Sequence, residues 1–154
     1  MKKIELTLAE NPIFKGLDQD YLKLIVKRAS DIHFNPGDFI LREGEEANQF
    51  YIILLGKVAL EIAFEPEREP VTIRTLGEGD VLGWSWLFPP YRWRFSAHAV
   101  TPTLAIALDG KYLRKKCEED HDLGYELMKR FARIIEQRLQ SVRMQFPNVY
   151  AIHS

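Results

Sequence analysis

The apolar residues between positions 31 and 108 fall in short or alternating runs, which Gly, Pro and acidic residues interrupt. This pattern is typical of a domain made of many short antiparallel strands. We expect eight strands, at roughly Asp31–Phe34, Phe39–Leu41, Gln49–Leu55, Lys57–Ala63, Val71–Leu76, Val81–Leu82, Arg92–Ala99 and Thr103–Leu108.

The run Lys57–Ala63 shows the alternation most clearly, because Val58, Leu60 and Ile62 share one face of an extended chain. It predicts a half-buried strand. The charged segment Glu65–Pro70 lacks apolar residues and predicts an exposed hairpin loop. Turns with positive φ are expected at glycines that end the runs, namely Gly37, Gly44 and Gly56.

Helical periodicity flanks the β region on its N-terminal side. Asn11–Phe14 predicts a short turn that ends at Gly16. Asp18 is a good N-cap for a second helix, whose apolar residues form one broad face. We expect this helix to end near Ser30.

Two helices are expected after the β region, at Lys111–Glu118 and at Leu123–Met144, before Pro147 prevents continuation. The long helix carries two apolar stripes, where packing on the β region alone needs one. The first holds Leu123, Leu127, Phe131 and Ile134, and the second holds Met128, Ile135, Leu139 and Val142. We expect the second stripe to form a homodimer; the alternative is one broad stripe buried within the monomer.

The composition favours a cytoplasmic protein of one domain. With 154 residues, 21 Lys and Arg against 22 Asp and Glu, and one cysteine, the chain has no net positive field and no internal disulfide. The basic residues from Arg130 to Arg143 alternate with apolar ones, as on a solvated helix face. No run reaches the roughly 20 apolar residues of a membrane helix, so we expect no membrane association.

Two segments resemble the paired signature of cyclic-nucleotide-binding domains in catabolite-activator and Fnr-like regulators. They are Pro36–Glu45, with its Pro-Gly-Asp start and Arg-Glu-Gly-Glu end, and Phe50–Val58, which ends in Gly-Lys-Val. The resemblance implies a mainly β fold with flanking helices: a double-stranded β-helix, or jelly-roll-like β-roll, of about eight antiparallel strands. The domain would span residues 8–146, with the roll at about 31–108 and the C-terminal helices at about 111–145.

The segment from Gly77 to Ala97 resembles the phosphate-binding cassette of this family, which implies a ligand site. Gly83 matches the cassette glycine, and Ser85–Phe88, which includes Trp86, matches its short helix. Trp84 stands where the family has a carboxylate for the ribose hydroxyl. Tryptophan has only an N–H donor, so a buried hydroxyl would lose its acceptor at a cost of about 1–3 kcal/mol.

The cassette arginine has two candidates, because counting back from Ser96 puts Trp93 in its place between Arg92 and Arg94. In a regular strand both arginines share one face, so either could meet an anion. The surrounding aromatic residues allow two interpretations: they fill the core in place of a nucleotide, or they form a stacking box for a ligand.

The function expected from the resemblance is that of a regulatory sensor, without enzymatic activity, cofactor or metal. Its ligand would be cAMP, cGMP or another anionic small molecule, and its signal would pass to an unknown protein partner. The alternatives are a roll that binds no ligand and acts as a dimeric interaction module, or a transcription regulator without its other domain. Only nine residues follow Gln145, too few for a helix-turn-helix, so direct DNA binding is not expected.

Overall fold

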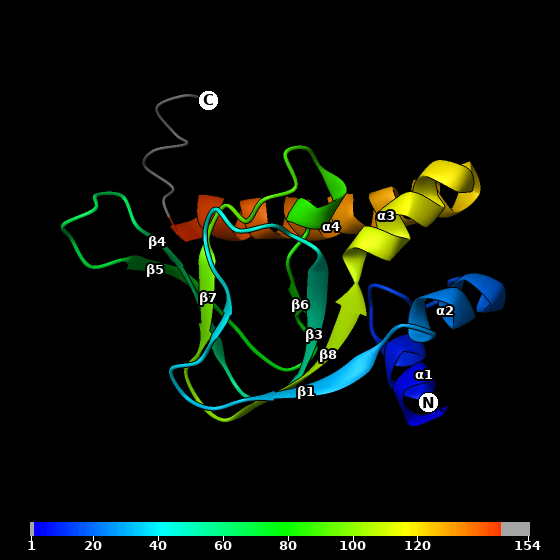
Figure 1. The fold of residues 1–154 in the computed structure, drawn as a ribbon, viewed down its shortest axis with the longest axis horizontal. Helices are drawn as coiled ribbons and strands as arrows, with labels where there is room; N and C mark the ends of the chain where they lie inside the picture. The colour runs from blue at the N-terminus through cyan, green and yellow to red at the C-terminus, as the bar shows by residue number, and fades with distance from the viewer. Residues whose placement is uncertain (1, 146–154) are drawn as a thin grey trace.

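The computed structural model describes residues 2–145. Helices flank a roll of eight strands, and a long helix crosses one end of the roll (Figure 1). The elements are α1 (Lys2–Glu10), α2 (Gln19–Val26), β1 (Ser30–Phe34), β2 (Phe39–Leu41), β3 (Gln49–Leu55), β4 (Val58–Ile62), β5 (Val71–Leu76), β6 (Val81–Leu82), η1 (Ser85–Leu87), β7 (Ser96–Ala99), β8 (Thr103–Asp109), α3 (Gly110–Glu119) and α4 (His121–Gln145).

The eight strands form two antiparallel four-stranded sheets, with the orders β1-β8-β3-β6 and β2-β7-β4-β5. Strand β8 pairs with both β1 and β3, so that Ala105 lies opposite Ile32 on one side and Ile53 on the other. In the second sheet β4 holds the same central place between β5 and β7. This confirms the mainly β fold and the eight predicted strands.

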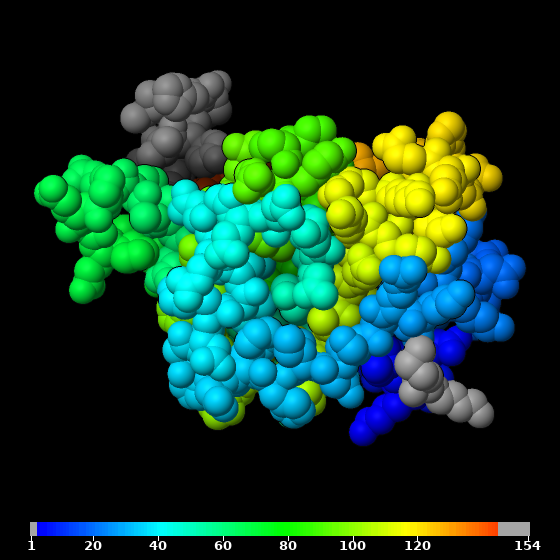
Figure 2. Space-filling model, in the orientation of Figure 1, coloured from blue at the N-terminus to red at the C-terminus, as the bar shows by residue number. Residues whose placement is uncertain are grey.

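The turns confirm the prediction of positive φ at the glycines that end the apolar runs: φ is 91° at Gly37, 89° at Gly44 and 102° at Gly56. The segment Glu65–Pro70 is exposed throughout. It belongs to the β4–β5 connection, which protrudes from the body of the molecule in the space-filling view (Figure 2). The predicted hairpin loop is therefore confirmed.

Two local predictions were wrong, and one helix was missed. The second helix ends at Val26, and Ser30 already belongs to β1. The strand β4 is not half-buried, because Ala59 is 4% exposed beside buried Val58 and Leu60. Helix α1 was not predicted; its buried Leu8 joins the main core.

The predicted strand Arg92–Ala99 is shorter in the structure, because β7 begins only at Ser96. The residues before it pair with the loop between β2 and β3 instead. Trp93 donates its backbone N–H to Glu45 O at 3.0 Å, and Gly44 donates to Trp93 O at 2.9 Å. This loop pairing ends the regular strand.

The two apolar stripes of α4 have different surroundings. The first stripe faces the roll: Leu123, Leu127 and Phe131 are at most 1% exposed, and Ile134 is partly buried against the core. In the second stripe Leu139 is 55% exposed, Met128 and Val142 are also exposed, and Ile135 is half-buried. The monomer therefore buries only one stripe.

Candidate ligand cassette

Gly83 of the cassette lies directly after β6 and has a backbone conformation that favours glycine. Its φ is 100°, which costs a residue with a β-carbon roughly 1–2 kcal/mol. A β-carbon built at this position would lie 2.6 Å from two carbons of the Trp93 ring. The absence of a side chain thus allows both the turn and the close packing of Trp93.

The short helix η1 follows and carries the most deeply buried ring of the cassette. The Trp86 ring is fully buried and stacks on Phe50, with 4.7 Å between the ring centroids and 9° between the planes. It also meets Phe131 of α4 edge to face at 5.4 Å. The indole Nε1 has no hydrogen-bond partner among the described residues. Trp86 therefore joins the cassette to α4 by apolar packing.

Arg114 of α3 contacts the cassette at two points, Trp86 and Tyr91. Its Nη1 donates to the backbone oxygen of Trp86 at 2.7 Å, and its guanidinium carbon lies 3.8 Å from the centroid of the Tyr91 ring. Tyr91 has a φ of 57°, a left-handed conformation that is rare for an aromatic residue. Hydrogen bonds from Tyr91 N to Phe88 O and from Ala47 N to Tyr91 O, both 2.8 Å, hold this conformation.

Trp84 precedes η1, at the position where the family resemblance implies a carboxylate. Its ring is partly buried against the core, and the guanidinium carbon of Arg138 lies 4.8 Å from its centroid. Arg138 also donates a hydrogen bond to Val81 O. Because the only polar atom of the indole is a donor, this position offers no acceptor to a ligand hydroxyl.

The structure distinguishes the two candidate arginines at the other end of the cassette. Arg92 and Arg94 are both exposed, while Trp93 and Phe95 are buried, so the expected alternation holds without a regular strand. Arg92 Nη1 donates to Gly44 O at 2.9 Å. Arg94 has no hydrogen-bond or ion-pair partner among residues 2–145. Of the two guanidinium groups, that of Arg94 is therefore the one not held by another described residue.

Ser96, the last of the predicted site residues, is part of the framework of the roll. Its Oγ accepts a hydrogen bond from the backbone N–H of Glu43 at 2.9 Å. The link joins the start of β7 to the loop after β2. The structure thus groups Gly83, Trp84, Ser85 and Trp86 on one limb of the cassette, and it places Arg92, Arg94 and Ser96 on the other.

Arg114 and Arg138 were not among the predicted site residues, and the prediction of a solvated face for the basic residues from Arg130 to Arg143 was wrong. Arg130 has a side chain that is only 17% exposed, and Arg138 is partly buried. The sequence did contain a sign of this burial, because residues seven positions apart share one face of a helix. Arg130 lies seven residues after Leu123, and Arg138 lies seven residues after Phe131.

Within the described residues, no group of three or more His, Cys, Asp or Glu side chains lies close enough together to hold a metal ion. In the same part of the chain, every helix is too short or too polar to cross a membrane. The single cysteine, Cys117, is half-buried on α3. Burial, followed by the charges of Glu118 and Asp120, raises the pKa of its thiol to about 11.

The chain thus combines an eight-stranded β-roll, a glycine turn followed by the short helix η1, and a long helix across one end of the roll. The family model of the cyclic nucleotide-binding domain matches residues 31–120, more than half of the chain. The chain therefore belongs to the cyclic nucleotide-binding domain family.

Relatives of this chain include kinases and transcription regulators. A cGMP-dependent protein kinase of Drosophila melanogaster, isozyme 2 forms cD5/T2, is 40% identical over 72 residues, which cover 47% of this chain and 8% of the kinase. The CRP-like cAMP-activated global transcriptional regulator of Mycobacterium tuberculosis is 27% identical over 126 residues, or 82% of this chain and 56% of the regulator. The chain thus spans only part of the length of these relatives.

Solved structures share the whole fold. A crystal structure from Geobacter metallireducens, named as a cyclic nucleotide-binding protein, has a TM-score of 0.78 and 26% sequence identity, and the match covers 90% of this chain and 96% of that one. The sensor domain of the transcriptional regulator DNR from Pseudomonas aeruginosa has a TM-score of 0.72 at 18% identity, covering 90% and 93% of the two chains. The second likeness concerns the fold alone.

Proposed function

We propose that this chain is a regulatory sensor that binds an anionic small molecule at the cassette and passes the signal to a protein partner. The observation that carries this proposal is the cassette itself. Gly83 holds its turn at a φ of 100°, and η1 follows at Ser85–Leu87. The guanidinium of Arg94 has no partner within the part of the chain that the structure describes. An unpaired arginine is suited to bind phosphate or carboxylate through charge-assisted hydrogen bonds.

The names of the relatives support cyclic nucleotides as the first ligands to test, because they include a cGMP-dependent kinase and a cAMP-activated regulator. Trp84 argues against tight binding of an ordinary ribose. Losing the hydroxyl acceptor at a cost of about 1–3 kcal/mol lowers affinity by roughly one to two powers of ten. We therefore expect cAMP or cGMP to bind weakly, and a ligand without a ribose to bind more tightly.

The route for the signal is the contact between the cassette and the C-terminal helices. Arg114 connects α3 to the backbone of Trp86, and Trp86 packs on Phe131 of α4. A ligand that moves η1 must change one or both of these contacts. The exposed stripe of Met128, Leu139 and Val142 on α4 is the proposed homodimer interface.

The proposed location of the protein is the cytoplasm, because a reducing compartment suits a chain with a single thiol.

Calorimetric titration of the full chain with cAMP and with cGMP, up to millimolar concentration, tests the proposal. We expect saturable binding that Arg94→Gln weakens by about tenfold, as for a lost charge-assisted hydrogen bond. Arg68→Gln is the matched control, since Arg68 lies in the exposed β4–β5 loop, has a side chain that is 80% exposed, and forms an ion pair with Glu65 of the same loop. If neither nucleotide binds and no small molecule co-purifies by mass spectrometry, the proposal fails.

One observation favours a second function, that of a dimeric interaction module without a ligand. Trp86 is 0% exposed and Trp93 is 6% exposed, so both rings already pack the cassette without a ligand. On this alternative the titrations give no heat, while dimer formation through α4 and binding to a protein partner persist. The same calorimetry therefore separates the two functions.

A further inference from the structure

A cavity lies outside the cassette, between α4, the turn that joins α1 to α2, and the β5–β6 turn. It has a volume of about 460 Å³, within the usual range of small-molecule sites. None of the residues from Gly83 to Ser96 lines it. Six of its lining residues have basic side chains and two have acidic ones: Lys15, Arg74, Lys129, Arg130, Arg133 and Arg138 against Asp80 and Glu126.

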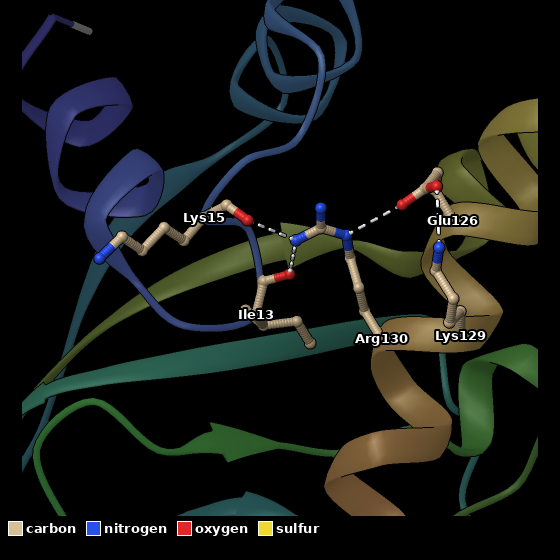
Figure 3. A network of polar contacts seen from close by, with 5 residues as sticks. All are labelled: Ile13, Lys15, Glu126, Lys129 and Arg130. Carbon is tan, nitrogen blue, oxygen red and sulfur yellow. Dashed lines mark hydrogen bonds and ion pairs between the residues drawn. The ribbon is translucent and has the colours of Figure 1, made fainter.

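Part of this charge is already neutralised by a network that builds one wall of the cavity (Figure 3). Arg130 of α4 donates to the backbone oxygens of Ile13 at 2.8 Å and Lys15 at 2.9 Å. Glu126 accepts from Arg130 at 3.4 Å and from Lys129 at 3.2 Å. The side chain of Lys15 extends away from Arg130 in this view, so Lys15 contributes its carbonyl and not its charge.

The remaining arginine side chains, those of Arg74, Arg133 and Arg138, form no ion pair within residues 2–145. Nε of Arg74 and Nη1 of Arg138 are buried from solvent and make no hydrogen bond. Arg133 is exposed and has no hydrogen-bond or ion-pair partner in residues 2–145. Two buried donors without acceptors are unusual in a folded protein, and both are suited to bind an acceptor group in the cavity.

The electrostatics of the cavity agree with the geometry. Burial, followed by the nearby charge of Arg74, lowers the pKa of Arg138 to about 10, and Asp80 opposes the shift. Asp80 is partly used by its own turn, because one carboxylate oxygen accepts from Gly77 N at 2.8 Å. Two like charges that face each other in a partly dry site are stabilised by an anion placed between them.

We propose that this cavity binds a small molecule through a phosphate or diphosphate group, held by Arg74, Arg133 and Arg138. Arginine forks match phosphate oxygens, and several charges at one site favour an anion of charge two or more. Arg138 also lies against the Trp84 ring. Occupation of the cavity is thus transmitted to the first limb of the cassette, although the site is separate from the cassette and does not rest on the function proposed above.

Calorimetry of the full chain with inorganic pyrophosphate, at constant ionic strength, tests the site. We expect one saturable site, which Arg133→Gln and Arg138→Gln each weaken by about tenfold, as for a lost charge-assisted hydrogen bond. Arg68→Gln, which removes the same charge from the exposed β4–β5 loop, changes the affinity less than about twofold, since distant surface charges are screened. The fluorescence of Trp84 should respond, and Trp84→Phe should remove that response.

Four outcomes would overturn the inference. These are the absence of saturable binding, an equal loss in Arg68→Gln, binding of malonate in place of pyrophosphate, or loss of binding in Arg94→Gln with retention in Arg133→Gln. The last result would assign the anion to the cassette. Arg133 is exposed, so its variant should fold and remain informative even if Arg138→Gln does not.

Discussion

The indole ring of Trp93 lies against the α-carbon of Gly83, and the two residues close the cassette by direct packing. One stands at the start of the cassette and the other just before β7, so their contact joins the two limbs. An ideal β-carbon at Gly83 would meet the ring at 2.6 Å. Any ligand that enters between the limbs must therefore move an aromatic ring that is 6% exposed.

Gly83→Ala should destabilise the protein by about 2–4 kcal/mol, combining the strain of positive φ with overpacking against Trp93. Gly77→Ala is the matched control, because a β-carbon there meets nothing within 4 Å and its φ is not positive. Urea unfolding followed by fluorescence measures both. Equal stability of the two variants would contradict the packing described for Gly83.

Trp84→Glu should strengthen cAMP binding by about 10- to 100-fold, because the carboxylate supplies the acceptor that a ribose hydroxyl needs. Arg138, which lies over the ring, would then have an anionic neighbour. Trp84→Ala is the control, since it removes the ring without adding an acceptor. A titration in which both variants gain equally would mean that the indole only obstructs the site.

Leu139→Glu should convert the proposed dimer to a monomer while leaving the unfolding temperature of the roll nearly unchanged. Leu139 is 55% exposed in the monomer, so a charge there changes the free energy of unfolding little. The same charge opposes dimer formation, because a second helix would cover it. Gln140→Glu, at an exposed polar position of the same helix, should leave the dimer intact. Sedimentation at micromolar concentration distinguishes the species, and a monomeric parent chain would contradict the interface.

Cys117 should react slowly with thiol reagents. With a thiol pKa of about 11, only about one thiol in a thousand is ionised at pH 8, and the thiolate is the reactive form. The pKa is raised, so the reaction should accelerate roughly tenfold per pH unit and level off only near pH 11. Glutathione and the protein in concentrated urea are the controls, and alkylation at the rate of glutathione would contradict this environment.

The sequence alone was enough for the strands, because each buries residues at a period of two or as a short apolar run between turns. The prediction failed at Arg92–Phe95. Exposed and buried side chains do alternate there, but the backbone pairs with a loop and not with a strand. Trp93 pairs its backbone with Gly44 and Glu45. A periodic pattern reports which side chains are buried and does not report which backbone accepts the hydrogen bond.

The candidate site was predicted less completely, for a related reason. The cassette residues are contiguous, so a local resemblance located Gly83 and η1. The basic cavity is assembled from Arg74 on β5 and Arg138 on α4, which are 64 positions apart in the chain. Their charges look like ordinary surface charges until the fold places them together, and only the spacing of Arg138 from Phe131 indicated that it faces inward.

Arg114 fastens the cassette to α3. One side chain from α3 holds the carbonyl of Trp86 and covers the ring of Tyr91, so the loop is fastened at two points to a helix that leads into α4. In the proposed sensor, a weakly bound ligand leaves both contacts of Arg114 in place. Only a ligand that binds more strongly than these contacts releases the cassette from α3. The affinity needed to displace Arg114 therefore sets the lowest ligand concentration to which the proposed sensor responds.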